Sequence, residues 1–224
     1  MIKNILLDCD GVLYPLEELS TKEIVEAMKQ VYRNDVGLTP DEQRAISEKT
    51  IKENHLGMFN YINEICRYKN YDFDEFCEHM VEKINYDGIK PNPVLWNALQ
   101  NVSDKYNVGV LTNNCRAHLD KVFQCVFGKN IAQVEKSSVK AYDIKFMEHG
   151  GYFRPKQDEI GLVMFLKKQG FKRDETILFD DTPRNIEKAK DVGMKAVLIS
   201  KENTLLKELN KLGNIVSGAV KTYE

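Results

Sequence analysis

Three short apolar runs of this sequence end abruptly in polar residues, and this pattern constrains the fold more than any other feature. The runs are residues 5–7, before Asp8, residues 107–111, before Thr112, and residues 176–179, before Asp180. Buried strands of a parallel sheet are short and apolar, and ligands bind outside their carboxyl ends. Helical patterns separate the runs, as expected of strands joined by helical crossovers. The sequence therefore predicts an α/β fold with a doubly wound, Rossmann-like parallel sheet.

The first run is followed by two acids, Asp8 and Asp10, and by Gly11. A strand has a period of two residues, so both acids point to one side if the extended backbone continues past Leu7. Neighbouring carboxylates need a cation or a shared proton, and magnesium prefers oxygen ligands. One aspartate could then attack a phosphoryl group while the other transfers a proton. The alternative is a strand that ends in a solvated acidic turn.

A long helical stretch separates the first run from the second. Its patterns start at a capping-box sequence, residues 20–23, and at Thr39 with Pro40, and continue over residues 59–68 and 74–84. We expect these helices to form an inserted bundle, the cap, over residues 16–88. The core would then consist of residues 1–15 and 89–224, and a chain of 224 residues is long enough for such an arrangement.

The second run ends in Thr112 and Asn113. A hydroxyl group and backbone amides at a strand end suit a phosphate oxygen, although a polar cap of the next helix explains the same residues. Two cations, Arg154 and Lys156, precede a helical pattern that ends at Gly170. A lysine there could neutralise an anionic site, and the alternative is an ordinary surface lysine.

The third run ends in paired acids, Asp180 and Asp181, and Asn185 lies in the helix expected next. Two adjacent acids repel each other, and a divalent cation between this pair and the first pair relieves the repulsion. A further strand at residues 197–199 and a helix at residues 205–212 complete the expected order, with a loosely held tail after them.

Charge and cysteine content argue against several classes of function. Lysine and arginine total 32 against 34 acids, a net charge of −2, so we expect neither a nucleic acid polymer nor a membrane as partner. No run approaches the ~18 apolar residues of a membrane span, and the chain starts without a leader pattern. The five cysteines are scattered, which predicts free thiols and a cytoplasmic location. Cys9 and Cys115 flank the expected site, but buried cysteine is more common than a nucleophile.

Together the motifs resemble those of the haloacid dehalogenase-like hydrolases. Their first motif, D-x-D-G-[TV], stands at residues 8–12, and their second, an apolar strand ending in Thr and Asn, at residues 111–113. Their fourth motif, an acidic pair with a polar residue four positions on, corresponds to Asp180, Asp181 and Asn185. The third often reads K-P-D-P-x-x-F, and residues 156–159 lack both prolines. The ungapped match to Gly170 favours Lys156 over Arg154.

The insert is similar to the cap of the pyrimidine 5'-nucleotidase-type phosphatases of this family. The resemblance lies in D-x-D-x-x-L-Y-P at residues 8–15 and in His55-Leu56-Gly57-Met58-Phe59 in the middle of the insert. The chain departs from that group at Gly11, where asparagine is usual, and at Phe59, which stands in place of an arginine region of that group.

This resemblance implies a magnesium-dependent phosphatase of small phosphorylated metabolites, acting as a monomer or homodimer. Asp8 would attack phosphorus to give an aspartyl-phosphate, and Asp10 would act as acid and base. The nucleoside 5'-monophosphates are the favoured substrates. The remaining implied roles are metal binding by Asp8, the carbonyl of Asp10, Asp181 and Asp180, phosphate binding by Lys156, Thr112 and Asn113, orientation of the acids by Asn185, and contact with the leaving group by Tyr14, His55, Met58 and Phe59.

Several alternatives share much of this pattern. A phosphomutase or a sugar-phosphate phosphatase has the same core residues and differs mainly in the cap. A dehalogenase uses a lone aspartate on carbon without a metal, which Asp10 and the acidic pair argue against. A degenerate member that only binds a phosphorylated ligand is disfavoured by the intact Asp8, Asp10, Lys156 and Asp181.

Overall fold

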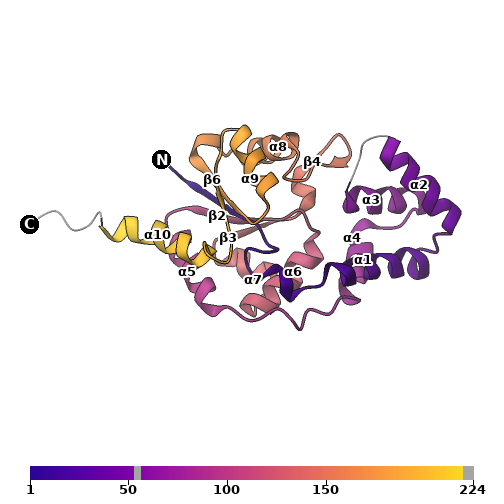
Figure 1. The fold of residues 1–224 in the computed structure, drawn as a ribbon, viewed down its shortest axis with the longest axis horizontal. Coiled ribbons are helices and arrows are strands. Elements are labelled where there is room, and N and C mark those ends of the chain that lie inside the picture. Colours follow the sequence, from indigo (N-terminus) through magenta and orange to yellow (C-terminus); the bar gives the residue numbers. More distant parts are fainter. Residues whose placement is uncertain (53–56, 219–224) are drawn as a thin grey trace, which may run out of the picture.

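The computed structural model describes residues 1–52 and 57–218 of the chain. An α/β core carries a separate group of helices at one end (Figure 1). In the core, five parallel strands have the order β3-β2-β1-β6-β7. Their bounds are β1 (Asn4–Leu7), β2 (Asn107–Leu111), β3 (Val139–Tyr142), β6 (Thr176–Asp180) and β7 (Lys195–Leu198). The predicted doubly wound parallel sheet is confirmed.

The central strand is β1, which pairs with β2 on one side and with β6 on the other. Its residues are all buried, because helices cover both faces of the sheet. Figure 1 shows α8 and α9 on one face and α5, α6 and α7 on the other, where α10 packs against α5. The bounds are α5 (Pro93–Ser103), α6 (Arg116–Phe127), α7 (Ile131–Lys136), α8 (Glu159–Gln169), α9 (Pro183–Asp191) and α10 (Leu205–Gly218). Helix α10 thus continues beyond residue 212, where the expected helix ended.

The insert is helical, as expected. Its bounds are α1 (Thr21–Gln30), continued by a π-helical turn (Val31–Asp35), α2 (Pro40–Lys52), α3 (Met58–Lys69) and α4 (Phe73–Glu82). The predicted capping box at residues 20–23 was wrong, because the Ser20 side chain makes no capping hydrogen bond. The reciprocal bonds occur instead at α2, where Thr39 and Glu42 each accept the backbone N–H of the other.

Two chain segments connect the cap to the core, and they run side by side. A Cβ atom at Gly88 would collide with the backbone carbonyl of Glu18, and the Lys90 N–H donates to the Glu18 carboxylate at 3.1 Å. The outgoing and returning segments therefore meet near residues 18 and 88. The cap boundaries at residues 16 and 88 stay a prediction.

A short hairpin of the core, which the sequence did not predict, also contacts the cap. It consists of β4 (Glu148–His149) and β5 (Tyr152–Phe153). Asn60 of α3 donates to the Phe153 carbonyl and accepts the Phe153 N–H, both at 2.9 Å. Arg67 of α3 donates to the Gly151 carbonyl at 2.6 Å. The cap therefore rests on the segment that leads to Lys156. Among the described residues, none of the helices combines the length and apolarity that crossing a bilayer requires.

Candidate active site

The polar residues singled out in the sequence meet at the carboxyl end of the sheet. Asp8 and Thr112 directly follow β1 and β2, and Asp180 is the last residue of β6. Parallel register brings these strand ends together, since Leu7 pairs with Val110 and with Phe179. Lys156 reaches the same edge from the loop before α8.

Lys156 lies between two carboxylates and is fully buried. Its Nζ is 2.6 Å from Asp8 Oδ1 and 2.6 Å from Asp180 Oδ2. The exposed fraction of Lys156 is 0%, that of Asp180 is 0% and that of Asp8 is 7%. Burial opposes a charged lysine, but the two carboxylates raise its pKa and keep it protonated. The site thus has one buried cation and two buried anions.

Three carboxylates form a candidate metal site. Oxygen atoms of Asp8, Asp180 and Asp181 all lie within 4.8 Å of one another. Burial raises the pKa of Asp8 well above its usual range, Lys156 opposes this shift, and the charge of Asp180 adds to it. Burial and the charge of Asp180 also raise the pKa of Asp181. An all-oxygen donor set with excess negative charge fits a magnesium ion.

Gly11 allows the third carboxylate to approach. Its φ is +76°, a conformation that favours glycine, and a Cβ atom at this position would collide with the Asp181 carboxylate. The loop after β1 can therefore pass directly beneath Asp181. This requirement explains a glycine at the position where the sequence departs from the nucleotidase pattern.

Asn185 is hydrogen-bonded to Asp180, one of the two acids that it was expected to orient. Its Nδ2 donates to both carboxylate oxygens of Asp180, at 2.9 and 3.1 Å. The Thr182 N–H donates to Asp180 Oδ1 at 2.9 Å. With the bond from Lys156, these donors hold Asp180 in one position at the end of β6.

Thr112 and Asn113 lie at the site, but their side chains also organise the backbone. The Thr112 hydroxyl is buried and accepts the Asn114 N–H at 3.0 Å. Asn113 Oδ1 accepts the Lys156 N–H at 2.8 Å, and its Nδ2 donates to Gln157 at 3.0 Å. Asn113 therefore holds the loop that carries Lys156. Phosphate binding by Thr112 and by the Asn113 amide stays a prediction.

Arg154, the rival cation, lies outside this cluster. Its guanidinium group pairs with Asp158 at 3.3 Å, one helical turn away, and its side chain is 27% exposed. The Nε atom of Arg154 is buried without a partner among the described residues. The geometry therefore favours Lys156 over Arg154 as the cation of the site.

Asp10 belongs to a second cluster, which contains a residue that sequence reasoning missed. Asp10 Oδ1 lies 2.5 Å from the Tyr14 hydroxyl and 2.8 Å from His118 Nε2. Burial acts to raise the pKa of Asp10, but the charge of His118 and these hydrogen bonds lower it to about 2. Burial acts to lower the pKa of His118, and Asp10 raises it on balance. The only sequence signal was the position of His118, six residues beyond Thr112.

Cys9 completes a possible ligand set with Asp10 and His118, since donor atoms of the three lie within 4.8 Å of one another. Cys9 is fully buried, and burial together with the charges of Asp10 and Asp8 raises the pKa of its thiol well above the usual range. Metal binding and nucleophilic attack both need the thiolate. Neither role is favoured here, and Cys115 is buried as well.

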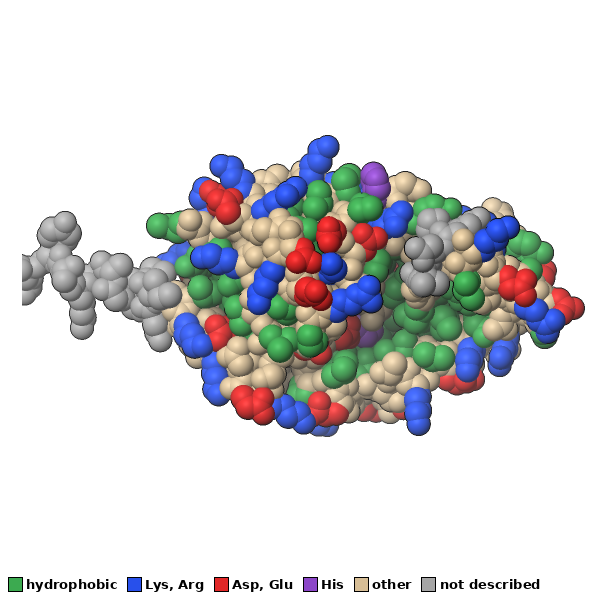
Figure 2. All heavy atoms as spheres, turned by 45° about the horizontal axis from the view of Figure 1, so that its top comes forward, with side chains coloured by type: hydrophobic (Ala, Val, Ile, Leu, Met, Phe, Trp, Pro, Cys, Tyr) green, Lys and Arg blue, Asp and Glu red, His purple; other side chains and the backbone are tan. Residues whose placement is uncertain are grey.

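A pocket of about 270 Å³ opens beside Asp10, between the core and the start of α3. Figure 2 shows this face of the molecule hollowed, with hydrophobic side chains around the hollow. Met58 and Phe59 line the pocket, as proposed, whereas Tyr14 is buried behind Asp10. His55 lies outside the described residues. The other lining residues are Gly57, Asn60, Asn113, Asn114, Ile144, Phe153, Pro155 and Gln157.

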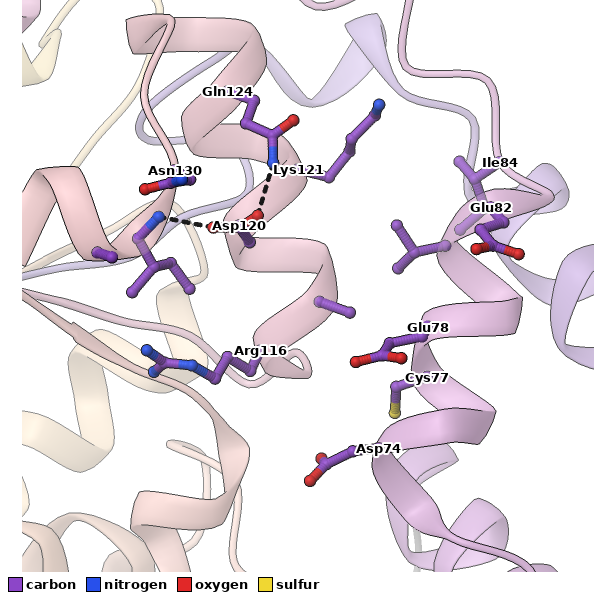
Figure 3. A pocket seen from close by; sticks show the side chains of 14 residues that line it. Asp74, Cys77, Glu78, Glu82, Ile84, Arg116, Asp120, Lys121, Gln124 and Asn130 are labelled. Carbon is purple, nitrogen blue, oxygen red and sulfur yellow. Dashed lines mark hydrogen bonds between the residues drawn. The ribbon is translucent and has the colours of Figure 1, made fainter.

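A larger groove of about 720 Å³ is lined by residues of α4 and α6. Figure 3 shows Asp74, Glu78 and Glu82 on the α4 wall, with Arg116 and Lys121 on the α6 side. None of the residues proposed for catalysis lines this groove. The smaller pocket beside Asp10 is therefore the better candidate for substrate binding.

Comparison with models of protein families shows which family the chain belongs to. The family described as haloacid dehalogenase-like hydrolase matches residues 5–199. The chain belongs to this family. The match includes the cap as well as every residue of the two clusters. No curated protein matches the chain at a significant level.

Solved structures of haloacid dehalogenase-like (HAD) proteins share the fold at low sequence identity. A HAD-like hydrolase from Porphyromonas gingivalis is 19% identical, covers 95% of this chain and 98% of its own, and has a TM-score of 0.56. A HAD enzyme from Bacteroides thetaiotaomicron, in complex with magnesium and inorganic phosphate, is 19% identical. The match covers 89% of this chain and 95% of that enzyme, with a TM-score of 0.51.

A 2-haloacid dehalogenase from Pseudomonas syringae is 15% identical, over 98% of this chain and 100% of its own, with a TM-score of 0.52. Structural neighbours of this HAD hydrolase therefore include both a phosphate complex and a dehalogenase. The fold alone does not select the reaction, and the residues of the site must do so.

Proposed function

We propose that this hydrolase is a magnesium-dependent phosphatase of small phosphorylated metabolites that forms an aspartyl-phosphate intermediate. The observation that carries the proposal is the buried Lys156 between Asp8 and Asp180, with Asp181 beside them. Phosphoryl transfer requires compensation of negative charge, which a buried cation and a metal site supply. A dehalogenase needs neither the acidic pair nor Asp10.

Asp8 is the proposed nucleophile. Its Oδ1 accepts the Cys9 N–H at 2.7 Å and is held by Lys156, so one carboxylate oxygen is fixed and the other is available for attack. Lys156 neutralises charge on the phosphoryl oxygens as the bond to phosphorus forms. The Thr112 hydroxyl and the Asn113 amide are the proposed donors to the same oxygens.

Asp10 is the proposed acid and base. It protonates the departing oxygen and then accepts a proton from the water that hydrolyses the aspartyl-phosphate. Its low pKa in the free protein results from His118, and a bound phosphate dianion acts in the opposite direction, since a nearby negative charge raises the pKa of a carboxyl group. Substrate binding therefore favours the protonated form that the first step needs.

Asp8, Asp181, the backbone carbonyl of Asp10 and, directly or through water, Asp180 are the groups proposed to hold the magnesium ion. A bound ion would offset the negative charge of the carboxylates and of the phosphate group. The Bacteroides neighbour, a complex with magnesium and inorganic phosphate, supports magnesium as the ion.

For the substrate we propose a nucleoside 5'-monophosphate, with a pyrimidine base as the first choice. The pocket beside Asp10 offers apolar surface from Met58, Phe153 and Pro155, which suits a planar ring. The side-chain amide of Gln157, whose oxygen accepts from Asn113, can donate its N–H groups to ring or sugar atoms. Phe59 contributes less than expected, because it is 7% exposed and packs against Phe73.

A substrate panel tests the proposal. Phosphate release with magnesium is measured for uridine, cytidine and adenosine 5'-monophosphates and for sugar phosphates, with Asp8→Asn as the background control. We expect Asp8-dependent release and the highest kcat/KM for a pyrimidine nucleotide. A preference of about tenfold or more for a sugar phosphate, about 1.4 kcal/mol, overturns the nucleotide assignment. Absence of Asp8-dependent release from every compound overturns the phosphatase assignment.

A further inference from the structure

We propose that His118 is a positioning residue for Asp10, and that the two segments linking cap and core complete this arrangement through Tyr14 and Tyr86. The inference rests on the proposed function, because it concerns the proton transfer that Asp10 performs there. It adds a residue that the family motifs do not include.

His118 reaches Asp10 from the first turn of α6. Its side chain is 1% exposed, whereas that of Asp10 is 25% exposed and lines the substrate pocket. Because an ionised carboxylate only accepts hydrogen bonds, Nε2 of His118 must carry the hydrogen in the 2.8 Å contact. The imidazole therefore supports Asp10 from the protein side, away from the substrate.

Two donors converge on one oxygen of Asp10. The Tyr14 hydroxyl at 2.5 Å and His118 Nε2 at 2.8 Å both contact Oδ1. An oxygen that accepts two hydrogen bonds is a poor site for the acidic proton. This arrangement leaves Oδ2 as the oxygen that exchanges a proton with the leaving group.

The other nitrogen of His118 is also engaged. Nδ1 lies 2.8 Å from the Tyr86 hydroxyl, and the two rings are 5.7 Å apart at 49°. With Nε2–H donating to Asp10, Nδ1 accepts the Tyr86 O–H when the ring is neutral and donates to the Tyr86 oxygen when the ring is protonated, so the contact holds the ring in either state. Tyr86 is buried, at 4% exposure.

The two tyrosines come from the two connections of the cap. Tyr14 precedes the first residue of the proposed cap, and Tyr86 lies in the returning segment, close to Gly88. Each connection thus supplies one hydroxyl group to the Asp10–His118 pair. A displacement of either connection would alter the orientation of the Asp10 carboxyl group, so this network couples the placement of the cap to proton transfer.

The leaving group separates positioning from a merely structural role. Proton donation matters most when the departing oxygen is strongly basic, so phenyl phosphate, whose phenol has a pKa of about 10, depends on Asp10 more than 4-nitrophenyl phosphate does. Both substrates have similar size, and kcat/KM reports the step in which the ester bond breaks. We compare wild type with three variants. His118→Phe removes both ring nitrogens, and His118→Gln can restore one donor to Asp10. Tyr86→Phe removes the hydroxyl group that contacts Nδ1 of His118.

The measured quantity is the ratio of kcat/KM for phenyl phosphate to kcat/KM for 4-nitrophenyl phosphate. We expect His118→Phe to lower this ratio about tenfold or more relative to wild type. His118→Gln should recover most of this ratio, and Tyr86→Phe should change it in the same direction by at most about fivefold. In an Asp10→Asn background, His118→Phe should not change the ratio further. If His118→Phe does not fold, His118→Asn is judged by the same ratio.

Equal losses with the two substrates, or no loss with phenyl phosphate, overturn the proposal and leave His118 a structural residue. A further change of the ratio in the Asp10→Asn background also overturns it. If wild type releases no phosphate from either substrate in an Asp8-dependent manner, the proposed function fails and the inference fails with it.

Discussion

Replacement of Lys156 with methionine tests the centre of the site, because methionine keeps much of the volume and removes the charge. The lysine is 0% exposed and lies 2.6 Å from both Asp8 and Asp180. Its loss leaves two carboxylates buried without their cation. Removal of one partner of a buried ion pair costs about 3–5 kcal/mol. For a chain of this size, such a loss lowers Tm by about 6–20 °C.

Arg154→Ala is the matched control, because it removes the other cation of the same loop. Arg154 pairs with Asp158 at 3.3 Å across one helical turn, and 27% of its side chain is exposed. Partly exposed pairs of this kind contribute about 0.3–0.5 kcal/mol. We therefore expect Arg154→Ala to change stability and kcat/KM only slightly.

Stability is measured by thermal and urea unfolding with chelator present, and kcat/KM is measured below the Tm of each variant with magnesium present. Lys156→Met should lose about a hundredfold or more activity, as expected for loss of a charged group that stabilises the transition state. Added magnesium should raise its Tm by more than it raises that of wild type, because the carboxylates then lack an internal cation. A Tm of Lys156→Met within 2 °C of wild type, or a larger activity loss in Arg154→Ala, refutes the assignment.

The other predictions concern the metal site, the nucleophile and the cap. Excess chelator should abolish phosphate release and magnesium should restore it; undiminished release in chelator contradicts the metal assignment. Asp8→Asn should abolish turnover without loss of Tm, since the substitution keeps the shape and removes one of the two anions at Lys156; activity within about tenfold of wild type rules out the covalent mechanism. Gly11→Ala should weaken magnesium binding, measured by calorimetry, because the new methyl group displaces Asp181. Asn60→Leu should cost about 1–3 kcal/mol in urea unfolding by leaving the backbone groups of Phe153 unpaired, and an unchanged midpoint counts against this contact.

The strands that carry the site could be predicted because their signal is local. An apolar run that stops at Asp8, Thr112 or Asp180 needs no knowledge of the rest of the chain. Strand β3 (Val139–Tyr142) gave a weaker signal, since it has only four residues and one of them, Lys140, is exposed. The β4–β5 hairpin has two residues in each strand, too few for a periodic pattern.

The partners of the site residues could not be predicted, because they are set by tertiary structure. His118 is 108 residues from Asp10, and the hydrogen bond exists only because α6 starts beside the loop after β1. The side chain of Tyr14 was expected to face the leaving group. The position of Tyr14 in the motif does not indicate that its hydroxyl group points back to Asp10 instead.

The third motif shows how a departure from the family pattern can be compensated. Prolines restrict the backbone of a loop, and the loop before α8 lacks the two that usually accompany this lysine. Here Asn113 binds the Lys156 N–H and the Gln157 side chain, which fixes the loop through hydrogen bonds to the end of β2. At Gly161 a Cβ atom would collide with the Arg154 carbonyl, so glycine lets α8 approach the loop closely. The backbone order that proline supplies elsewhere comes here from Asn113 and from close packing, and Lys156 reaches Asp8 without those prolines.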